Sequence, residues 1–201
     1  MKQALLYSIN AEHLVNILNG LKTIEVRKRD LPQWAKDKLA RGEIVDGYMY
    51  CTKKQRTIMV LKKGEEMFGD VVGKTVFVKG EIANDYNKTR FMAGHVVVKF
   101  EVSSVNHLPS EHMDWLNEES SILKYSCLTL EQLLDYGKGK DLYAHHIKNI
   151  QPVNMELMEF YKLEPEIMYN NAEGVAFKHG GYVYNKLFKA PQSFQTVWVK
   201  S

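Results

Sequence analysis

The sequence has few cysteines and prolines and no long apolar run. Its two cysteines, Cys51 and Cys127, lie far apart and outside any CxxC pattern, which excludes a disulfide scaffold and a four-cysteine zinc site. No apolar run approaches the roughly 18 residues of a membrane span. Glu12 and His13 interrupt the start before a signal peptide can form. These absences predict a protein of the reducing cytoplasm, without a membrane partner.

Linkers and repeats are also lacking, and charge is unevenly distributed. With 5 prolines and no Pro/Gly/Ser-rich stretch, residues 1–201 are expected to form a single domain. The net charge is only +3, too small to indicate a nucleic-acid partner by itself. Residues 1–63 carry +7 and residues 174–201 carry +4, whereas residues 101–173 carry −8. If the chain ends meet, they form a basic surface, with an acidic region elsewhere.

The hydrophobic pattern indicates many strands with short helices between them. Strands are expected at 4–9, 23–27, 46–52, 75–82, 95–105, 142–150 and 193–199. Helices are expected at 11–19, 30–39, 110–136 and 155–161, with 164–181 irregular. Without a regular β-α-β rhythm, this order favours an α+β fold with a mixed β-barrel of about five to seven strands over a parallel sheet.

Residues 20–27 carry the most informative motif. Their sequence, GLKTIEVR, fits the GxKxxExR signature that follows the first helix of ASCH domains, and the chain resembles this family of the PUA-like superfamily. Residues 142–150 and 190–194 resemble later segments of ASCH proteins from Firmicutes and their phages. The resemblance implies a PUA-like barrel, in which 110–136 and 164–181 would be insertions.

Within this motif, strand alternation places Ile24 and Val26 inward and Thr23, Glu25 and Arg27 outward. A carboxylate beside a guanidinium can recognise a base edge or a phosphate. The same spacing also fits an ordinary surface salt bridge. The resemblance favours the ligand site, because this segment lines the groove of ASCH domains.

Further candidates come from outside the motif. In the 142–150 strand, alternation directs one of the two adjacent histidines, His145 or His146, inward. That histidine would act either as an acid–base group or as a core residue bonded to the backbone. His107 and His112 lack the spacing of metal ligands, so neither a metal nor a cofactor is expected. Ser193 is a loose counterpart of a serine that ASCH ribonucleases place near the C-terminal strand.

The main prediction is a binder of RNA or of a nucleotide-like ligand in a basic cleft. Lys22, Glu25 and Arg27 would form its polar wall and supply selectivity, joined by His145 and Ser193. Phosphate attraction would come from Arg29 and the lysines at 53, 54, 62 and 63.

Two alternatives remain. One is a hydrolase of RNA or of a modified nucleobase, with Lys22 and Glu25 as catalytic residues. The resemblance to acetylcytidine amidohydrolases is incomplete, because Glu25 occupies the position of their threonine and Thr23 does not replace it. The other is an adaptor that docks a protein partner through the acidic 101–173 segment.

Overall fold

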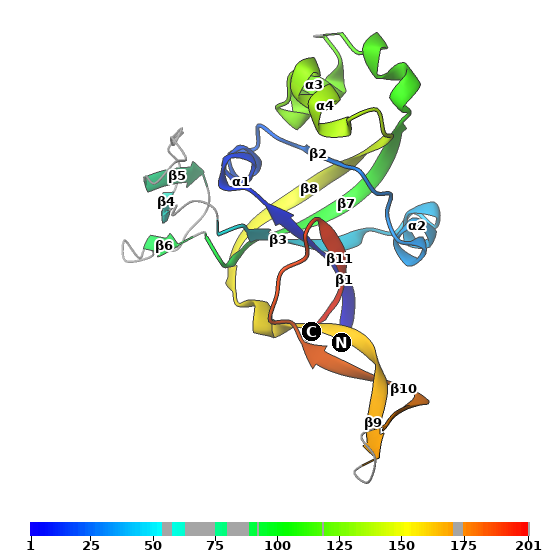
Figure 1. The fold of residues 1–201 in the computed structure, drawn as a ribbon. Coiled ribbons are helices and arrows are strands. Elements are labelled where there is room, and N and C mark those ends of the chain that lie inside the picture. The colour runs from blue at the N-terminus through cyan, green and yellow to red at the C-terminus, as the bar shows by residue number, and fades with distance from the viewer. Residues whose placement is uncertain are drawn as a thin grey trace.

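A computed structural model describes residues 1–53, 58–62, 75–79, 89–91, 93–117, 119–170 and 175–200. Its main feature is an eight-stranded mixed sheet in the order β10-β9-β11-β1-β3-β7-β8-β2 (Figure 1). The strands are β1 (Lys2–Ile9), β2 (Ile24–Arg27), β3 (Val45–Cys51), β7 (Val96–Leu108), β8 (Leu142–Met155), β9 (Phe160–Asn170), β10 (Val175–Lys186) and β11 (Phe194–Val199). Within it, β1 and β3 are parallel and the other pairs are antiparallel.

Short helices and a second sheet flank the main sheet. The helices are α1 (Ala11–Leu18), α2 (Gln33–Ala40), α3 (Ser121–Ser126) and α4 (Leu130–Gly137), with 3-10 turns η1 (Ser110–Trp115) and η2 (Leu157–Glu159). The second sheet has the order β5-β4-β6, formed by β4 (Ile58–Lys62), β5 (Thr75–Lys79) and β6 (Thr89–Phe91). Over the described residues, no helix is long and apolar enough to cross a membrane.

The mixed α+β architecture is confirmed, but the predicted closed barrel is wrong. Over the described residues, the ladder ends at β2 on one side and β10 on the other, so the main sheet is open. Strand alternation is the same in open and closed sheets, because closure depends on pairing between strands far apart in the chain. A local pattern therefore predicts the strands without predicting closure.

Two segments also differ from the expected elements. Most of the segment predicted as irregular, 164–181, lies in the antiparallel β9–β10 hairpin, which projects from the rest of the sheet (Figure 1). A register shift between Lys178 and Tyr182 accommodates the Gly180–Gly181 pair within β10. The helix predicted at 155–161 is only the single turn η2, followed directly by β9.

The core lies between the central strands and α1. Leu14 and Ile17 of α1 are fully buried against β1, β3 and β7. Gly47 of β3 sits opposite Phe100 of β7, and a Cβ at Gly47 would lie 2.3 Å from the Phe100 ring. The bare backbone at Gly47 therefore makes room for this aromatic ring in the core.

Candidate functional site

The site is built on β2, an edge strand that follows directly from α1. Gly20 adopts a positive φ of 75° and ends the helix, as its sequence predicts. The next two amides, of Leu21 and Lys22, donate to the carbonyl of Asn16. The backbone amide of Thr23 then donates to the carbonyl of Tyr125 in α3. This turn places Lys22 at the start of β2, under α3.

Three charged side chains of this segment form one buried cluster. The Glu25 carboxylate lies between two cations: its Oε1 is 2.9 Å from Arg27 Nη2, and its Oε2 is 3.3 Å from Lys22 Nζ. The side chains of Lys22, Arg27 and Glu25 are only 2%, 7% and 8% exposed. The prediction that Glu25 and Arg27 face outward is therefore wrong. Both lie on the face that β2 turns away from Ile24, but the rest of the protein covers that face.

The cations are also held by backbone carbonyls. Lys22 Nζ donates to the carbonyl of Ser126 at the end of α3, at 2.7 Å. Arg27 Nη2 donates to the carbonyl of Ser8 at 3.0 Å, and Arg27 Nη1 has long contacts of 3.5 Å with Ser193 O and Oγ. The Arg27 guanidinium lies 5.2 Å from the centre of the Tyr7 ring. For the buried Arg27 Nε, no acceptor is found among the described residues.

Electrostatics keeps the cluster ionised and positive. Burial alone would raise the pKa of the Glu25 carboxyl, but the Lys22 ammonium and the Arg27 guanidinium outweigh burial and hold that pKa below its ordinary value. Glu25 is therefore a carboxylate at neutral pH, and a weak base. Two cations against one anion leave a net positive charge in a region of low dielectric, where it acts strongly on nearby ligands.

A neutral histidine supports the cluster from below. His145 lies opposite Glu25 on β8 and is fully buried. Burial, followed by the charge of Arg27, lowers the pKa of His145 to about 4. Burial raises the pKa of the Tyr7 hydroxyl, which is hydrogen-bonded to His145 Nδ1 at 2.7 Å. His145 is thus the inward-facing histidine of the pair and is bonded to a side chain of β1, whereas His146 is half-buried.

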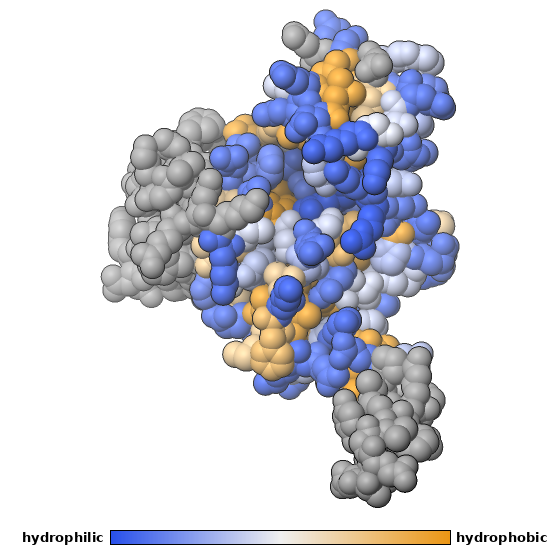
Figure 2. All heavy atoms as spheres, viewed as in Figure 1, coloured by the Kyte–Doolittle hydropathy of each residue, from blue (hydrophilic) through white to orange (hydrophobic). Residues whose placement is uncertain are grey.

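The cluster forms the floor of a cleft of about 530 Å³. Its walls come from α1, β2, α4 and the ends of β1 and β3, together with the segment before β11. The lining residues are Ser8, Ile9, Asn10, Glu12, His13, Lys22, Glu25, Val26, Arg27, Thr52, Leu128, Gln132, Tyr136, Gln192 and Ser193. Figure 2 shows hydrophilic side chains prevailing on the face where these elements meet. The lining combines these polar side chains with the apolar Ile9, Val26 and Leu128.

Helix α4 supplies one wall of the cleft, from the segment predicted as an insertion. It begins with the capping box expected from the sequence: Gln132 N donates to Thr129 Oγ1 at 3.1 Å, and Thr129 N donates to Gln132 Oε1 at 3.0 Å. Gln132 and Tyr136 then face the cleft one helical turn apart. The Lys28 ammonium lies 4.9 Å from the centre of the Tyr136 ring, which places a cation at the rim.

No family model and no curated protein matches this sequence. Among solved structures, the ASCH protein of Zymomonas mobilis matches with a TM-score of 0.50 at 15% identity, over 98% of this chain and 87% of that chain. The chain has the fold of an ASCH domain. Two mutant forms of the same Zymomonas protein match with TM-scores of 0.45 and 0.48, at 15% and 14% identity, over 78% and 98% of this chain and 77% and 88% of theirs.

At 15% identity, this likeness shows a shared fold. The chemistry of this chain depends on the residues of its own cleft. The structure brings four of the predicted residues into that cleft: Lys22, Glu25, Arg27 and Ser193. His145 lies beneath its floor. Arg29 is exposed and does not line it.

The lysines predicted to attract phosphate are only partly described. Lys53 is exposed and packs its side chain near Gly94. Lys62 is described only by its place in β4, and the lysines predicted at 54 and 63 lie outside the described residues. Lys53 does not line the cleft, whose cations are the buried Lys22 and Arg27.

Several cleft residues were missed by the sequence interpretation. His13 is half-buried on α1, and burial, then the charge of Lys22, lowers the pKa of its ring, which stays neutral at neutral pH. Asn10 occupies the N-cap position of α1 as expected, but its side chain accepts a hydrogen bond from Thr52 Oγ1 at 2.8 Å instead of capping the helix. The sequence does point to Asn10 and His13, because the first stands at the N-cap position of the helix that directly precedes the 20–27 motif and the second lies within that helix. No local pattern places Thr52 or Gln132 beside them.

Proposed function

We propose that this ASCH fold binds a nucleotide unit of RNA in the cleft. The observation that carries the proposal is the buried Lys22–Glu25–Arg27 cluster on the cleft floor, with two cations against one carboxylate. Excess positive charge under a cleft attracts phosphate and carbonyl oxygens. The charge is fixed by the fold, so a ligand does not have to order flexible lysines before it binds.

The cleft walls carry groups that suit a nucleobase. Asn10, Gln132 and Gln192 contribute side-chain amides. The oxygens of Asn10 and Gln132 already accept from Thr52 and Thr129, so these two present mainly their N–H donors, whereas Gln192 offers a donor and an acceptor. RNA recognition uses such groups to read the edges of unpaired bases. The volume of about 530 Å³ lies within the range of about 300–1,000 Å³ typical of small-molecule sites.

Arg27 is the group on the floor best placed to reach a ligand. Its Nη2 is engaged by Glu25 and Ser8, whereas its Nη1 has only the long contacts of 3.5 Å with Ser193. Ordinary N–H···O bonds are about 2.7–3.2 Å long. A ligand oxygen that approaches Nη1 can therefore take a shorter bond than the protein supplies, while Nη2 keeps Arg27 in place.

A titration with labelled single-stranded RNA at two salt concentrations tests the proposal. Arg27 is a poor first target because its loss disturbs the buried cluster, so the variant is Gln192→Ala, at an exposed position on the cleft wall. Binding is expected to weaken with salt and to fall roughly two- to tenfold in this variant. The matched control is Gln151→Ala, which removes an exposed amide from β8 outside the cleft lining. Equal binding by both variants would contradict the proposal.

A second candidate is hydrolysis of RNA or of a modified nucleobase. It is favoured by the hydroxyls of Thr52 and Ser193, which line the same cleft as Lys22 and the neutral His13. Glu25 is a weak base here, since the two cations beside its carboxylate lower its pKa. The test is to incubate the protein with RNA and, separately, with acetylated cytidine. Turnover that His13→Ala abolishes while RNA binding persists would select the enzyme.

A further inference from the structure

The segment 187–193 connects β10 to β11 and is anchored at both ends. Leu187 is buried, and its amide donates to the carbonyl of Phe160 at 2.8 Å. At the other end, Ser8 Oγ donates to the carbonyl of Pro191 at 2.6 Å, and the Ser8 amide donates to the carbonyl of Ser193 at 2.8 Å. Between these anchors Phe188 is 76% exposed. An aromatic ring is therefore held in solvent on a fixed stretch of backbone.

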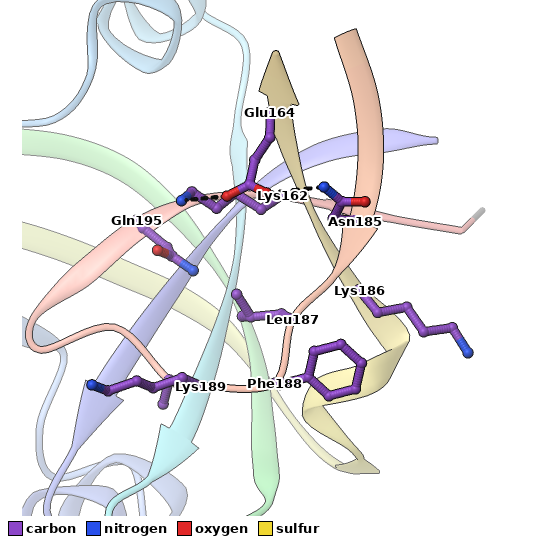
Figure 3. Close-up of a pocket in the computed structure, with 9 residues that line it drawn as sticks. Lys162, Glu164, Asn185, Lys186, Leu187, Phe188, Lys189 and Gln195 are labelled. Carbon is purple, nitrogen blue, oxygen red and sulfur yellow. Dashed lines mark hydrogen bonds and ion pairs between the residues drawn. The ribbon is translucent and has the colours of Figure 1, made fainter. Parts of the chain in front are cut away.

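Two hollows flank this ring. One, of about 340 Å³, lies towards the β9–β10 hairpin and includes Lys162, Lys186 and Gln195 (Figure 3). The other, of about 460 Å³, lies towards η2 and includes Met158. Both share the residues 188–190. Phe188 thus forms a ridge between two depressions, each large enough for a base or a sugar.

The charge around the ridge is positive. Lys162 is paired with Glu164 at 2.8 Å, and the second oxygen of Glu164 accepts from Asn185 at 2.9 Å (Figure 3). Lys186 and Lys189 are exposed, and over the described residues neither has an acidic partner. In Figure 3 their side chains extend away from the hollow in different directions. Two uncompensated cations therefore border Phe188.

A polar group faces the hollow from β11. Gln195 lines it, and the amide nitrogen Nε2 is buried with no acceptor among the described residues. A buried donor without an acceptor is costly. Because that nitrogen is closed off from solvent, only the rest of the Gln195 side chain faces the hollow.

We propose that the ridge at Phe188 is a stacking platform for single-stranded RNA that continues out of the cleft. A base stacks on Phe188, the phosphates lie near Lys186 and Lys189, and the sugar lies beside the Gln195 side chain. Aromatic rings with adjacent cations are the usual elements of single-strand binding surfaces. The proposal rests on the proposed function, because the RNA enters from the cleft.

The two sites are joined by the same short segment. Gln192 and Ser193 line the cleft, and Phe188 lies five residues before Ser193. Five residues span at most about 18 Å even when fully extended. An RNA of a few nucleotides is therefore long enough to reach from the cleft to the ridge.

The test compares two labelled RNAs, a dinucleotide that fills only the cleft and a mixed-sequence strand of about twelve nucleotides. Phe188→Ala is expected to weaken binding of the longer RNA at least about fivefold, and Phe188→Trp to restore it. Dinucleotide binding should stay unchanged. The control is Trp115→Ala, which removes an equally exposed ring, also 76%, from η1. Lys186→Gln and Lys189→Gln should each reduce the salt dependence for the longer RNA.

The outcomes separate the two proposals. If the longer RNA binds equally well to Phe188→Ala and Trp115→Ala, the platform is wrong while the cleft stands. If the wild-type protein binds neither RNA, the proposed function fails, and the platform fails with it. If the dinucleotide loses affinity in Phe188→Ala as much as the longer RNA does, Phe188 acts on the cleft instead, and the platform is again overturned.

Discussion

Glu25→Gln is expected to destabilise the protein strongly, although it changes one atom and little volume. The amide removes the charge that lies 2.9 Å from Arg27 and 3.3 Å from Lys22. Both cations are almost fully buried, so water in the cleft replaces the lost partner only in small part. Removing one member of a buried ion pair typically costs about 3–5 kcal/mol. For a chain of this size that lowers the thermal midpoint by roughly 6–20 °C.

Thermal and urea unfolding of the purified proteins, followed by circular dichroism, measure this effect. The matched control is Glu164→Gln, which breaks a Lys162–Glu164 pair of 2.8 Å on the surface. Solvent screens that pair, so its midpoint should change little. An unfolding midpoint for Glu25→Gln within a degree or two of wild type would refute the reasoning, since the cluster would then not depend on the carboxylate.

The pH dependence gives an independent check on Glu25. Because the two cations hold its folded-state pKa below the ordinary value of 4.5, the carboxylate stabilises the folded state above pH 4.5. That contribution is lost as the pH falls through the lowered pKa. The stability difference between wild type and Glu25→Gln should therefore be full at pH 7 and shrink in acid. A difference that grows in acid would have the wrong sign.

Three further predictions concern the core, the cleft wall and the buried histidine. Gly47→Ala should cost about 1–3 kcal/mol or more in urea unfolding, because its Cβ would lie 2.3 Å from the Phe100 ring; wild-type stability would contradict this packing. Thr129→Ala should cost about 1 kcal/mol and weaken RNA binding through the α4 wall; full affinity would exclude α4 from the site. His145, with its pKa lowered to about 4, should make the folded state lose about 3 kcal/mol between pH 6.5 and pH 4, since the unfolded chain takes up the proton first. His145→Gln should remove that loss, and an unchanged pH profile would refute it.

The sequence predicted the local structure of the site segments, but not which distant segments pack against them. The alternation at residues 23–27 predicts the strand, and Glu25 and Arg27 do share one face of it. Their burial was missed because the Arg27 side chain is covered by Tyr7 and Ser8 of β1 and by Ser193, segments far from β2 in the chain. Helices α3 and α4 pack instead on the opposite face, with Ile24 and Val26. Similarly, alternation leaves His145 and His146 equivalent, and only the position of Tyr7 on β1 decides between them. Contacts between distant segments are what a local pattern lacks.

The β9–β10 hairpin shows a different limit. Pro165 and the pair Gly180–Gly181 are signals for turns, and they favour an irregular segment. In the structure Pro165 pairs with Tyr182 within the hairpin, and the register shift accommodates the glycines. Only Phe160 and Tyr161 at the base of the hairpin pair with β11, and the rest is held by pairing between β9 and β10. The pairing partner of each strand cannot be read from a local pattern.

The most direct test of RNA binding in the cleft is to record the side-chain amide signals of the isotope-labelled protein while an RNA dinucleotide is added. The cleft predicts that the signals of Gln132 and Gln192 shift with one common affinity, while the signal of Gln151 stays in place. Shifts confined to other surfaces, or no shift at low salt, would contradict the assignment of the cleft as the RNA site.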